Sequence, residues 1–290
     1  MSAEKSYKET SGFISQFTNT CISVLKVLIQ SKFANTLSNE TSKTCIVLGN
    51  GPSLKTSLTN HKDFFKKHTL FCVNSFSMSD EYVELKPQYY VILDYSFWKS
   101  DGKIILDTLE AVKTKTTWPI TLLVPQMSAG SKRFEELSKA NPNIQLQYFN
   151  YTVFKGFPSI SHWFFTKNLA MPQSQNVLVA ATFLAINSNF KEVYVVGADH
   201  TWHENLHLDE NNLLSLRHIH FYDDVEKTTY IPFKKGIHST EIFKVHEIFA
   251  AWAKVFYGYI ALENYSKYKN CKLYNASEIT FVDAFERKKL

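Results

Sequence analysis

Apolar residues recur at helical spacing near the N-terminus. Their positions, three or four residues apart, place them on one side of a helix. A polar stretch over 33–43 then ends the pattern. We therefore expect residues 1–43 to form an amphipathic helical leader, which packs on the main domain or a partner, or lies on a membrane surface. The stripe consists of Phe13, Ile14, Phe17, Cys21, Val24, Leu25 and Leu28.

Short apolar runs follow the leader, and most of them stop at a polar residue, a glycine or a proline. Such runs indicate buried strands of a parallel sheet. Strands that alternate with helices are typical of a doubly wound sheet. We expect one α/β domain over 44–290 with a mostly parallel, Rossmann-like sheet. The expected strands are 45–48, 70–73, 89–93, 120–124, 144–149, 192–196 and 271–275, and the expected helices are 131–140, 176–187 and 240–257.

The segment 200–236 breaks this rhythm. It is rich in His, Asn, Asp and aromatic residues and has no regular periodicity. Long irregular segments in compact domains often cover a functional site, so we interpret 200–236 as a lid. Ligands of doubly wound sheets bind at the carboxyl ends of the strands, where the lid would lie.

Composition and charge limit the classes of partner that we expect the protein to bind. With 44% hydrophobic residues in 290, the chain can bury a large core. The net charge of +5 is spread along the sequence, which predicts no nucleic-acid partner but suits a phosphorylated ligand or an anionic membrane. The oligomeric state stays open, a homo-oligomer included.

Cysteine usage and apolar run length indicate the compartment. The four cysteines show no CxxC spacing and are typical of reduced thiols in the cytoplasm. No uninterrupted apolar run reaches about 18 residues, so we expect no membrane span. We predict a cytoplasmic protein, with the leader as a candidate for peripheral contact with the inner membrane. The cysteines are Cys21, Cys45, Cys72 and Cys271.

A glycine-rich turn follows the first expected strand. Its glycines allow close backbone approach, and its serine can cap the next helix, so the loop could cradle a phosphate through backbone amides. The turn has neither the third glycine of a dinucleotide fingerprint nor the Gly-Lys-Ser/Thr of a P-loop. We interpret it as the donor-binding loop, with a plain structural turn as the alternative. The loop is Gly49, Asn50, Gly51, Pro52 and Ser53.

Polar residues at other strand ends are further candidates. Asn74 and Asp94 each follow a strand and either bind a ligand in the crevice or only cap a turn. His238 precedes a helix and is our candidate general base for an acceptor hydroxyl, or else a capping or exposed histidine. His203 and His207 superficially resemble a zinc-protease motif, but no third ligand is evident, so we expect no metal. We prefer a polar and aromatic wall formed by Asp199, His200, Trp202 and His203.

The order and spacing of these motifs resemble the bacterial sialyltransferases of glycosyltransferase family 42 over about 44–285. The motifs are GNGPSL at 49–54, VNSF at 73–76, the segment 190–199 after a helix of small residues, and GIHS at 236–239. The resemblance implies a single-domain GT-A variant that inverts the anomeric carbon of a CMP-activated acidic sugar and needs no cofactor or metal. The CMP-sugar is a co-substrate, and the acceptor is a glycan or glycolipid of the bacterial surface.

By motif position, the resemblance also implies roles for individual residues. Asn50 and Asn74 would contact CMP, and His238 would be the base. Gln175 and Asn176 fall near the family's donor contact, and His200 and Trp202 fall where the family has phosphate-binding tyrosines. Because those tyrosines are missing and Asp94 stands near a family asparagine, sialic acid, Kdo and related nonulosonic acids are equally suitable sugars.

Two other interpretations stay open. The GNGPSL strand and loop also resemble the archaeal pterin pyrophosphokinase-like family, which implies diphosphate transfer from ATP with Mg²⁺ held by Asp94 or Asp199. A non-catalytic sugar- or nucleotide-binding module would instead bind CMP without transferring any sugar. Dependence on Mg²⁺ separates the first alternative from a glycosyltransferase, and absence of turnover identifies the second.

Overall fold

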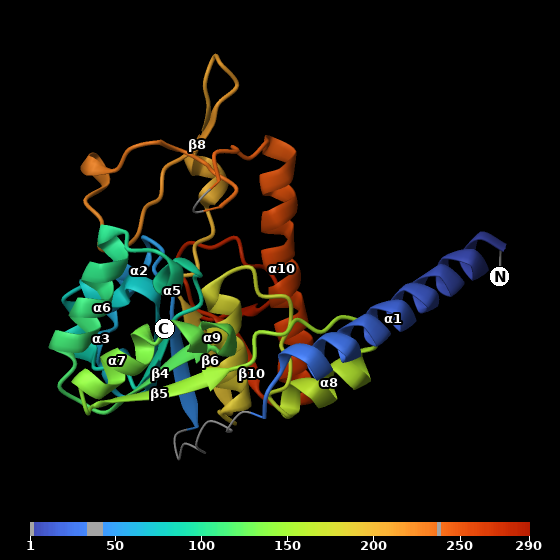
Figure 1. Cartoon of the computed structure of the whole chain (residues 1–290), viewed down its shortest axis with the longest axis horizontal. Coiled ribbons are helices and arrows are strands. Elements are labelled where there is room, and N and C mark those ends of the chain that lie inside the picture. The colour runs from blue at the N-terminus through green and yellow to red at the C-terminus, as the bar shows by residue number, and fades with distance from the viewer. Residues whose placement is uncertain (1–2, 34–42, 237–238) are drawn as a thin grey trace.

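The computed structural model describes residues 3–33, 43–236 and 239–290, with side chains from residue 12 onward. Within these residues the chain builds an α/β domain around an eight-stranded sheet, from which the N-terminal helix projects (Figure 1). All pairs of neighbouring strands in this sheet are parallel. The strands are β1 (Thr44–Leu48), β2 (Thr69–Val73), β3 (Tyr89–Val91), β4 (Ile120–Pro125), β5 (Ile144–Phe149), β6 (Glu192–Val196), β10 (Lys272–Asn275) and β11 (Glu286–Arg287).

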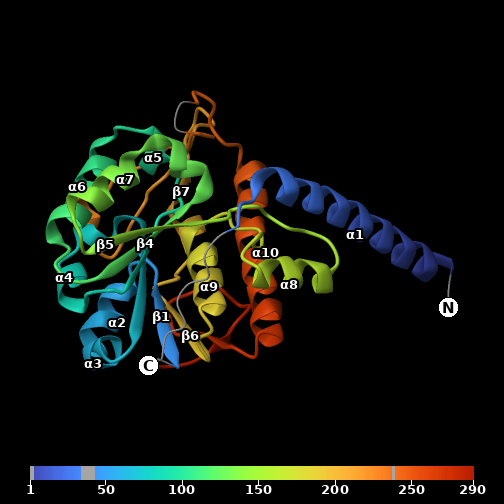
Figure 2. The same ribbon diagram turned by 60° about the horizontal axis from the view of Figure 1, so that its bottom comes forward.

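Helices cover both faces of this sheet, because alternate residues of each buried strand point to opposite faces. In β1, Cys45 and Val47 join one core cluster and Ile46 and Leu48 join the other. The first cluster includes α9 (Val177–Asn187) and α10 (Val245–Tyr268). The second includes helices from the opposite face (Figure 2), namely α2 (Leu54–Asn60), α3 (Lys62–Lys66), α4 (Glu81–Leu85), α5 (Ser96–Lys99), α6 (Lys103–Lys115) and α7 (Arg133–Ala140).

The strand order is β11-β10-β6-β1-β2-β3-β4-β5. The chain builds the sheet outward from β1 to β5 and then returns to place β6 on the other side of β1. The order therefore reverses between β1 and β6, and ligands of such sheets bind beside this point. The predicted doubly wound parallel fold is confirmed.

The lid segment is more regular than we predicted. Within 200–236 the chain forms a three-stranded antiparallel sheet of β7 (Leu206–Leu208), β8 (Leu214–Leu216) and β9 (Ile231–Pro232). The segment also contains the short 3₁₀ helices η3 (Trp202–Asn205) and η4 (Val225–Lys227). Strands of two or three residues are too short for an alternating pattern to stand out in the sequence.

Other boundaries also differ from the expected ones. Helix α1 (Ala3–Gln30) forms as predicted, whereas α10 begins five residues later than expected and extends to Tyr268. Helix α8 (Pro158–Thr166) lies in an aromatic-rich stretch for which we predicted neither a helix nor a strand. Proline at its first position favours a helix start, and that signal was present in the sequence.

Candidate functional site

A cleft of about 690 Å³ opens at the carboxyl ends of β1, β2 and β6, beneath the lid. It brings together predicted site residues from distant parts of the chain. Asn50, Gly51 and Pro52 come from the loop after β1, and Asn74 and Asp94 follow β2 and β3. Asn176 precedes α9, and Asp199, His200 and Trp202 follow β6. The lid adds lining residues that we did not select, among them Arg217, His220, Tyr222 and Asp223.

The glycines of the loop serve contact between two strand ends. A Cβ atom on Gly51 would lie 2.4 Å from Asp199 Oδ1, and one on Gly49 would lie 2.4 Å from the carbonyl oxygen of Gly197. The amides of Gly49 and Gly51 donate to the carbonyls of Val196 and Gly197, at 2.7 and 3.0 Å. The two glycine amides therefore already have protein acceptors and are not free to bind a phosphate.

The two aspartates of the predicted site differ in environment. Asp199 is buried and accepts from the Ser53 amide at 2.8 Å and the Ser53 hydroxyl at 2.6 Å. Burial raises the pKa of the Asp199 carboxyl, against the opposing effect of these hydrogen bonds. Asp94 is exposed and accepts from the amide and hydroxyl of Ser96, at 2.8 and 2.7 Å. Asp199 thus joins the β6 end to the loop 49–53, and Asp94 holds the turn into α5.

Two asparagine oxygens at the edge of the sheet have no partner among the described residues. Asn50 Nδ2 donates to the carbonyl of Val73 at 3.1 Å, while Asn50 Oδ1 is buried and unpaired. Asn74 Oδ1 is likewise buried and unpaired, and Asn74 has a left-handed φ of 46°. A buried acceptor without a donor costs about 1–3 kcal/mol, so a ligand or water that donates to it is expected. Both oxygens belong to residues that line the cleft.

His200 lies in the cleft wall in its neutral form. Its Nε2 is 2.7 Å from the Tyr259 hydroxyl and 3.2 Å from Asn176 Nδ2, and its ring stacks on Trp202. Burial lowers the pKa of His200 to about 3. Of the predicted polar and aromatic wall, Asp199, His200 and Trp202 line the cleft, whereas His203 is exposed and lies outside the lining. The buried, hydrogen-bonded His200 is poorly placed to accept a proton from a substrate.

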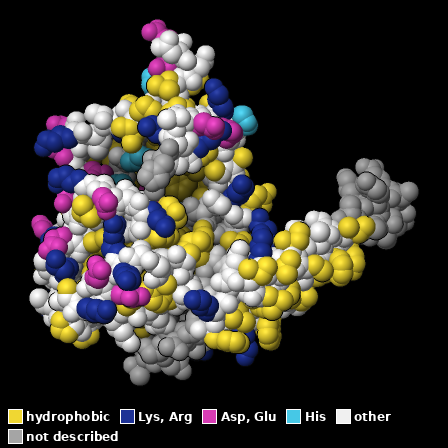
Figure 3. All heavy atoms as spheres, viewed as in Figure 1, with side chains coloured by type: hydrophobic (Ala, Val, Ile, Leu, Met, Phe, Trp, Pro, Cys, Tyr) yellow, Lys and Arg dark blue, Asp and Glu magenta, His cyan; other side chains and the backbone are white. Residues whose placement is uncertain are grey.

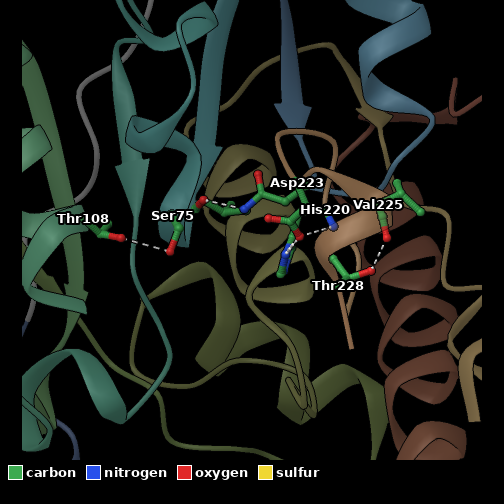
Figure 4. Close-up of polar contacts among 8 residues, drawn as sticks. Ser75, Thr108, His220, Asp223, Val225 and Thr228 are labelled. Atoms are coloured by element: carbon green, nitrogen blue, oxygen red, sulfur yellow. Dashed lines mark hydrogen bonds and ion pairs between the residues drawn. The ribbon is translucent and has the colours of Figure 1, made fainter. Parts of the chain in front are cut away.

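The lid places a histidine and a carboxylate beside the loop 49–53. His220 Nδ1 lies 2.9 Å from Asp223 Oδ2, which also accepts from the His220 amide at 2.7 Å. Figure 4 shows this pair together with the Ser75 and Thr108 hydroxyls. The Phe221 amide donates to the carbonyl of Asn50 at 3.1 Å, so this part of the lid is attached to the loop. Because Nδ1 faces the carboxylate, Nε2 is the ring nitrogen left for a substrate.

Arg217 follows β8 and contributes a cation to the cleft. Its Nε is buried without an acceptor among the described residues, and its guanidinium carbon lies 5.5 Å from the centre of the Tyr230 ring. Arg217 Nη2 makes a long contact of 3.5 Å with Asn205 Oδ1. A guanidinium group presents a planar set of donors that suits phosphate or carboxylate. Arg217 is therefore a candidate for binding an anion, and it was not among the residues selected from the sequence.

The remaining predicted residues are placed as follows. Gly49 and Ser53 belong to the loop but are absent from the cleft lining. Gln175 is exposed and is also absent from the lining. His238, the predicted base, lies outside the described residues. Among the described residues, no three His, Cys, Asp or Glu side chains are close enough to hold a metal by themselves. A Mg²⁺ ion here would take water or nucleotide phosphate oxygens among its ligands.

Comparison with known protein families finds one whose model matches most of this chain. The model of the family described as MptE-like, 6-hydroxymethylpterin diphosphokinase MptE-like, matches residues 19–205. The chain belongs to the MptE-like family. The match includes the loop 49–53, Asn74, Asp94 and the residues that follow β6 up to 205. It ends before Arg217 and before His220 and Asp223. The predicted resemblance to this family is confirmed, whereas membership in glycosyltransferase family 42 is not.

Comparisons with curated proteins and with solved structures give no match and a distant match, respectively. No curated protein matches the chain. Among solved structures, the MAf glycosyltransferase from Magnetospirillum magneticum AMB-1 is similar, with 13% sequence identity and a TM-score of 0.49. The similarity covers 95% of this chain and 38% of the MAf chain, so this MptE-like chain spans well under half of that glycosyltransferase.

Proposed function

We propose that this MptE-like protein is a transferase that moves a group from a nucleotide donor to an acceptor hydroxyl and releases a nucleoside monophosphate. The donor that we favour is a CMP-activated acidic sugar, namely sialic acid, Kdo or a related nonulosonic acid. The observation that carries the proposal is the cleft, where Asn50 and Asn74 offer unpaired oxygens and Arg217 offers an unpaired donor. These groups suit the amino and hydroxyl groups of a nucleoside and the oxygens of a phosphate or carboxylate.

The diphosphokinase activity in the family description is the second candidate, supported by the match over 19–205. Both reactions begin with attack by a hydroxyl. Attack on the anomeric carbon of a CMP-sugar releases CMP, and attack on the β-phosphorus of ATP releases AMP. Both reactions need a group that accepts the hydroxyl proton and a site for the departing monophosphate. The cleft contains candidates for both roles.

The charges in the cleft favour the CMP-sugar. The lining of the cleft has three carboxylates, from Asp94, Asp199 and Asp223. Among the described lining residues, Arg217 is the one Lys or Arg. A CMP-activated acidic sugar brings one phosphate and one carboxylate, whereas the triphosphate of ATP brings more negative charge. Because like charges repel strongly in a partly dehydrated site, ATP would need Mg²⁺ to bind here.

In the proposed reaction, His220 Nε2 accepts the proton of the acceptor hydroxyl. The hydroxyl oxygen forms a bond to the anomeric carbon, the bond from that carbon to the phosphate oxygen breaks, and CMP leaves with the bonding electrons. Asp223 holds the ring in the tautomer with its proton on Nδ1 and stabilises the charged ring. Arg217 would bind a phosphate or carboxylate of the donor.

A panel of nucleotides tests the proposed donor. The melting temperature of the protein is measured with CMP, CDP, UDP, GDP and ATP, each with and without Mg²⁺, because a ligand that binds the native state raises it. We expect CMP to raise the melting temperature without Mg²⁺. A shift with ATP that depends on Mg²⁺, and no shift with CMP, would instead support diphosphate transfer. Binding of CMP with no transfer from any CMP-sugar would indicate a binding module.

Removing the Asn74 side chain is expected to weaken donor binding. Glycine is the suitable replacement, because it accepts the left-handed φ of 46° without strain. Loss of one hydrogen bond to the donor should raise its Kd by about tenfold. Calorimetric titration with CMP measures the change. Asn212→Gly is the matched control, since Asn212 also has a left-handed φ, 58°, and is exposed on the lid. Equal affinity in both variants would remove Asn74 from the donor site.

A further inference from the structure

Helix α1 carries its apolar residues away from the α/β domain. It projects from the domain in both ribbon views, and hydrophobic side chains run along it (Figures 1, 2 and 3). Of its segment Gly12–Gln30, only 17% is buried. This segment is long and apolar enough to cross a membrane by length and composition, which our count of uninterrupted apolar residues did not reveal. The exposed apolar residues are Phe13, Ile14, Phe17, Ile22, Leu25, Leu28 and Ile29.

A narrow side of α1 attaches it to the domain. Thr20, Ser23 and Val27 are buried there, and Ser23 Oγ donates to the carbonyl of Lys155 at 2.9 Å. At the end of the helix, the Lys32 amide donates to Asn150 Oδ1 at 2.9 Å. With 3.6 residues per turn, the exposed apolar residues span about half of the helix circumference. An apolar surface this wide, outside the core, needs another apolar environment.

The charges around α1 indicate what that environment is. The two segments that pack together here, 12–33 and 141–176, contain no Asp or Glu. Their charged residues are Lys26, Lys32, Lys155 and Lys167, all exposed. Neighbouring α8 adds two exposed side chains, Ile160 and Trp163. Basic residues beside an apolar helix and a tryptophan are typical of proteins that bind an anionic membrane surface.

We propose that α1 lies in the interface of an anionic phospholipid bilayer, with its exposed apolar half in the acyl boundary and the lysines near the headgroups. This inference is independent of the proposed function, since none of these residues lines the cleft. Protein partners fit the pattern less well, because an apolar helix face gives a protein partner no reason to favour lysines without acidic residues over 12–33 and 141–176.

Flotation with lipid vesicles tests this inference. The full-length protein is mixed with vesicles of phosphatidylglycerol and phosphatidylcholine, or of phosphatidylcholine alone, and the fraction that floats is measured. We expect binding to the anionic vesicles that weakens as salt concentration rises. The double variant Ile14→Glu/Leu25→Glu should bind at least roughly tenfold less, because two apolar side chains would no longer be buried in lipid. Gln16→Glu is the matched control, since it adds one charge at an exposed polar position of the same helix.

Two results would overturn the inference. One is equal flotation of the wild type and Ile14→Glu/Leu25→Glu, with both shown to be folded by circular dichroism. The other is no binding to anionic vesicles while light scattering shows a dimer that the double variant lacks, because a second copy of the chain would then cover α1. Donor binding by the double variant reports on the cleft separately, so failure of either proposal can be recognised without the other.

Discussion

Replacing His220 with glutamine is expected to lower turnover by roughly 10² to 10⁴-fold, the usual contribution of a general base. The donor Kd should change little, because the proposed role of His220 is to accept a proton from the acceptor. Release of CMP from the CMP-sugar, followed in a single turnover with acceptor present, measures the effect. Asp223→Asn should also slow the reaction. A neutral amide at position 223 would stabilise the protonated imidazole ring less than the carboxylate does.

The control for His220 comes from the same lid. His207 is exposed on β7 and does not line the cleft, so His207→Gln should retain wild-type turnover. His238→Gln tests the base predicted from the sequence. Loss of turnover in His238→Gln with full activity in His220→Gln would return the role to His238. Full activity in both variants would leave the reaction without a histidine base.

The sheet was predictable because its strands are short, buried and apolar. In β1 every residue from Cys45 to Leu48 is buried, so the run stands out from the polar residues around it. Strands β7 and β9 are mostly exposed and consist of three and two residues, and a pattern that short is not distinct from a loop. Burial thus made the central strands visible in the sequence, whereas β7 and β9 were concealed by their exposure and the buried β8 by its length of three residues.

The site was predictable where strand ends decide it. Asn50, Asn74 and Asp199 meet because parallel strands end at one edge of the sheet beside the switch point. Arg217 and the pair of His220 with Asp223 depend on how the lid folds back, and the contact of Phe221 with Asn50 that places them is between backbone atoms. A contact between backbone atoms leaves no pattern of side chains in the sequence from which it could be predicted. The spacing of His220 and Asp223, three residues apart, was a usable signal for a local pair.

The position of the glycine loop was predicted from the sequence, and the reason for its glycines has two explanations. Two explanations account for glycine at position 51, namely space for a ligand phosphate or space for the β6 end. The structure favours the second, because Asp199 and Gly197 occupy the position that a side chain would need. The two explanations predict opposite results for one substitution, which makes the distinction testable.

Gly51→Ala is expected to reduce the free energy of unfolding by about 1–3 kcal/mol, the usual cost of an overpacked core. Its Cβ would lie 2.4 Å from Asp199 Oδ1 and 2.6 Å from the carbonyl oxygen of Gly197, and both of these groups belong to the packed end of β6. A shift of the loop away from Asp199 would strain the hydrogen bonds that Ser53 donates to the Asp199 carboxylate. Urea denaturation of the protein without ligand measures the loss.

Gly130→Ala is the matched control for this substitution, since a Cβ there would meet nothing within 4 Å. It should leave the free energy of unfolding unchanged or raise it by less than about 1 kcal/mol, because alanine restricts the unfolded chain more than glycine does. If Gly51→Ala were as stable as Gly130→Ala and instead lost affinity for CMP, the loop glycine would serve ligand approach after all. The unfolding experiment therefore separates the structural role of the loop from its role in binding, because it is carried out with no nucleotide present.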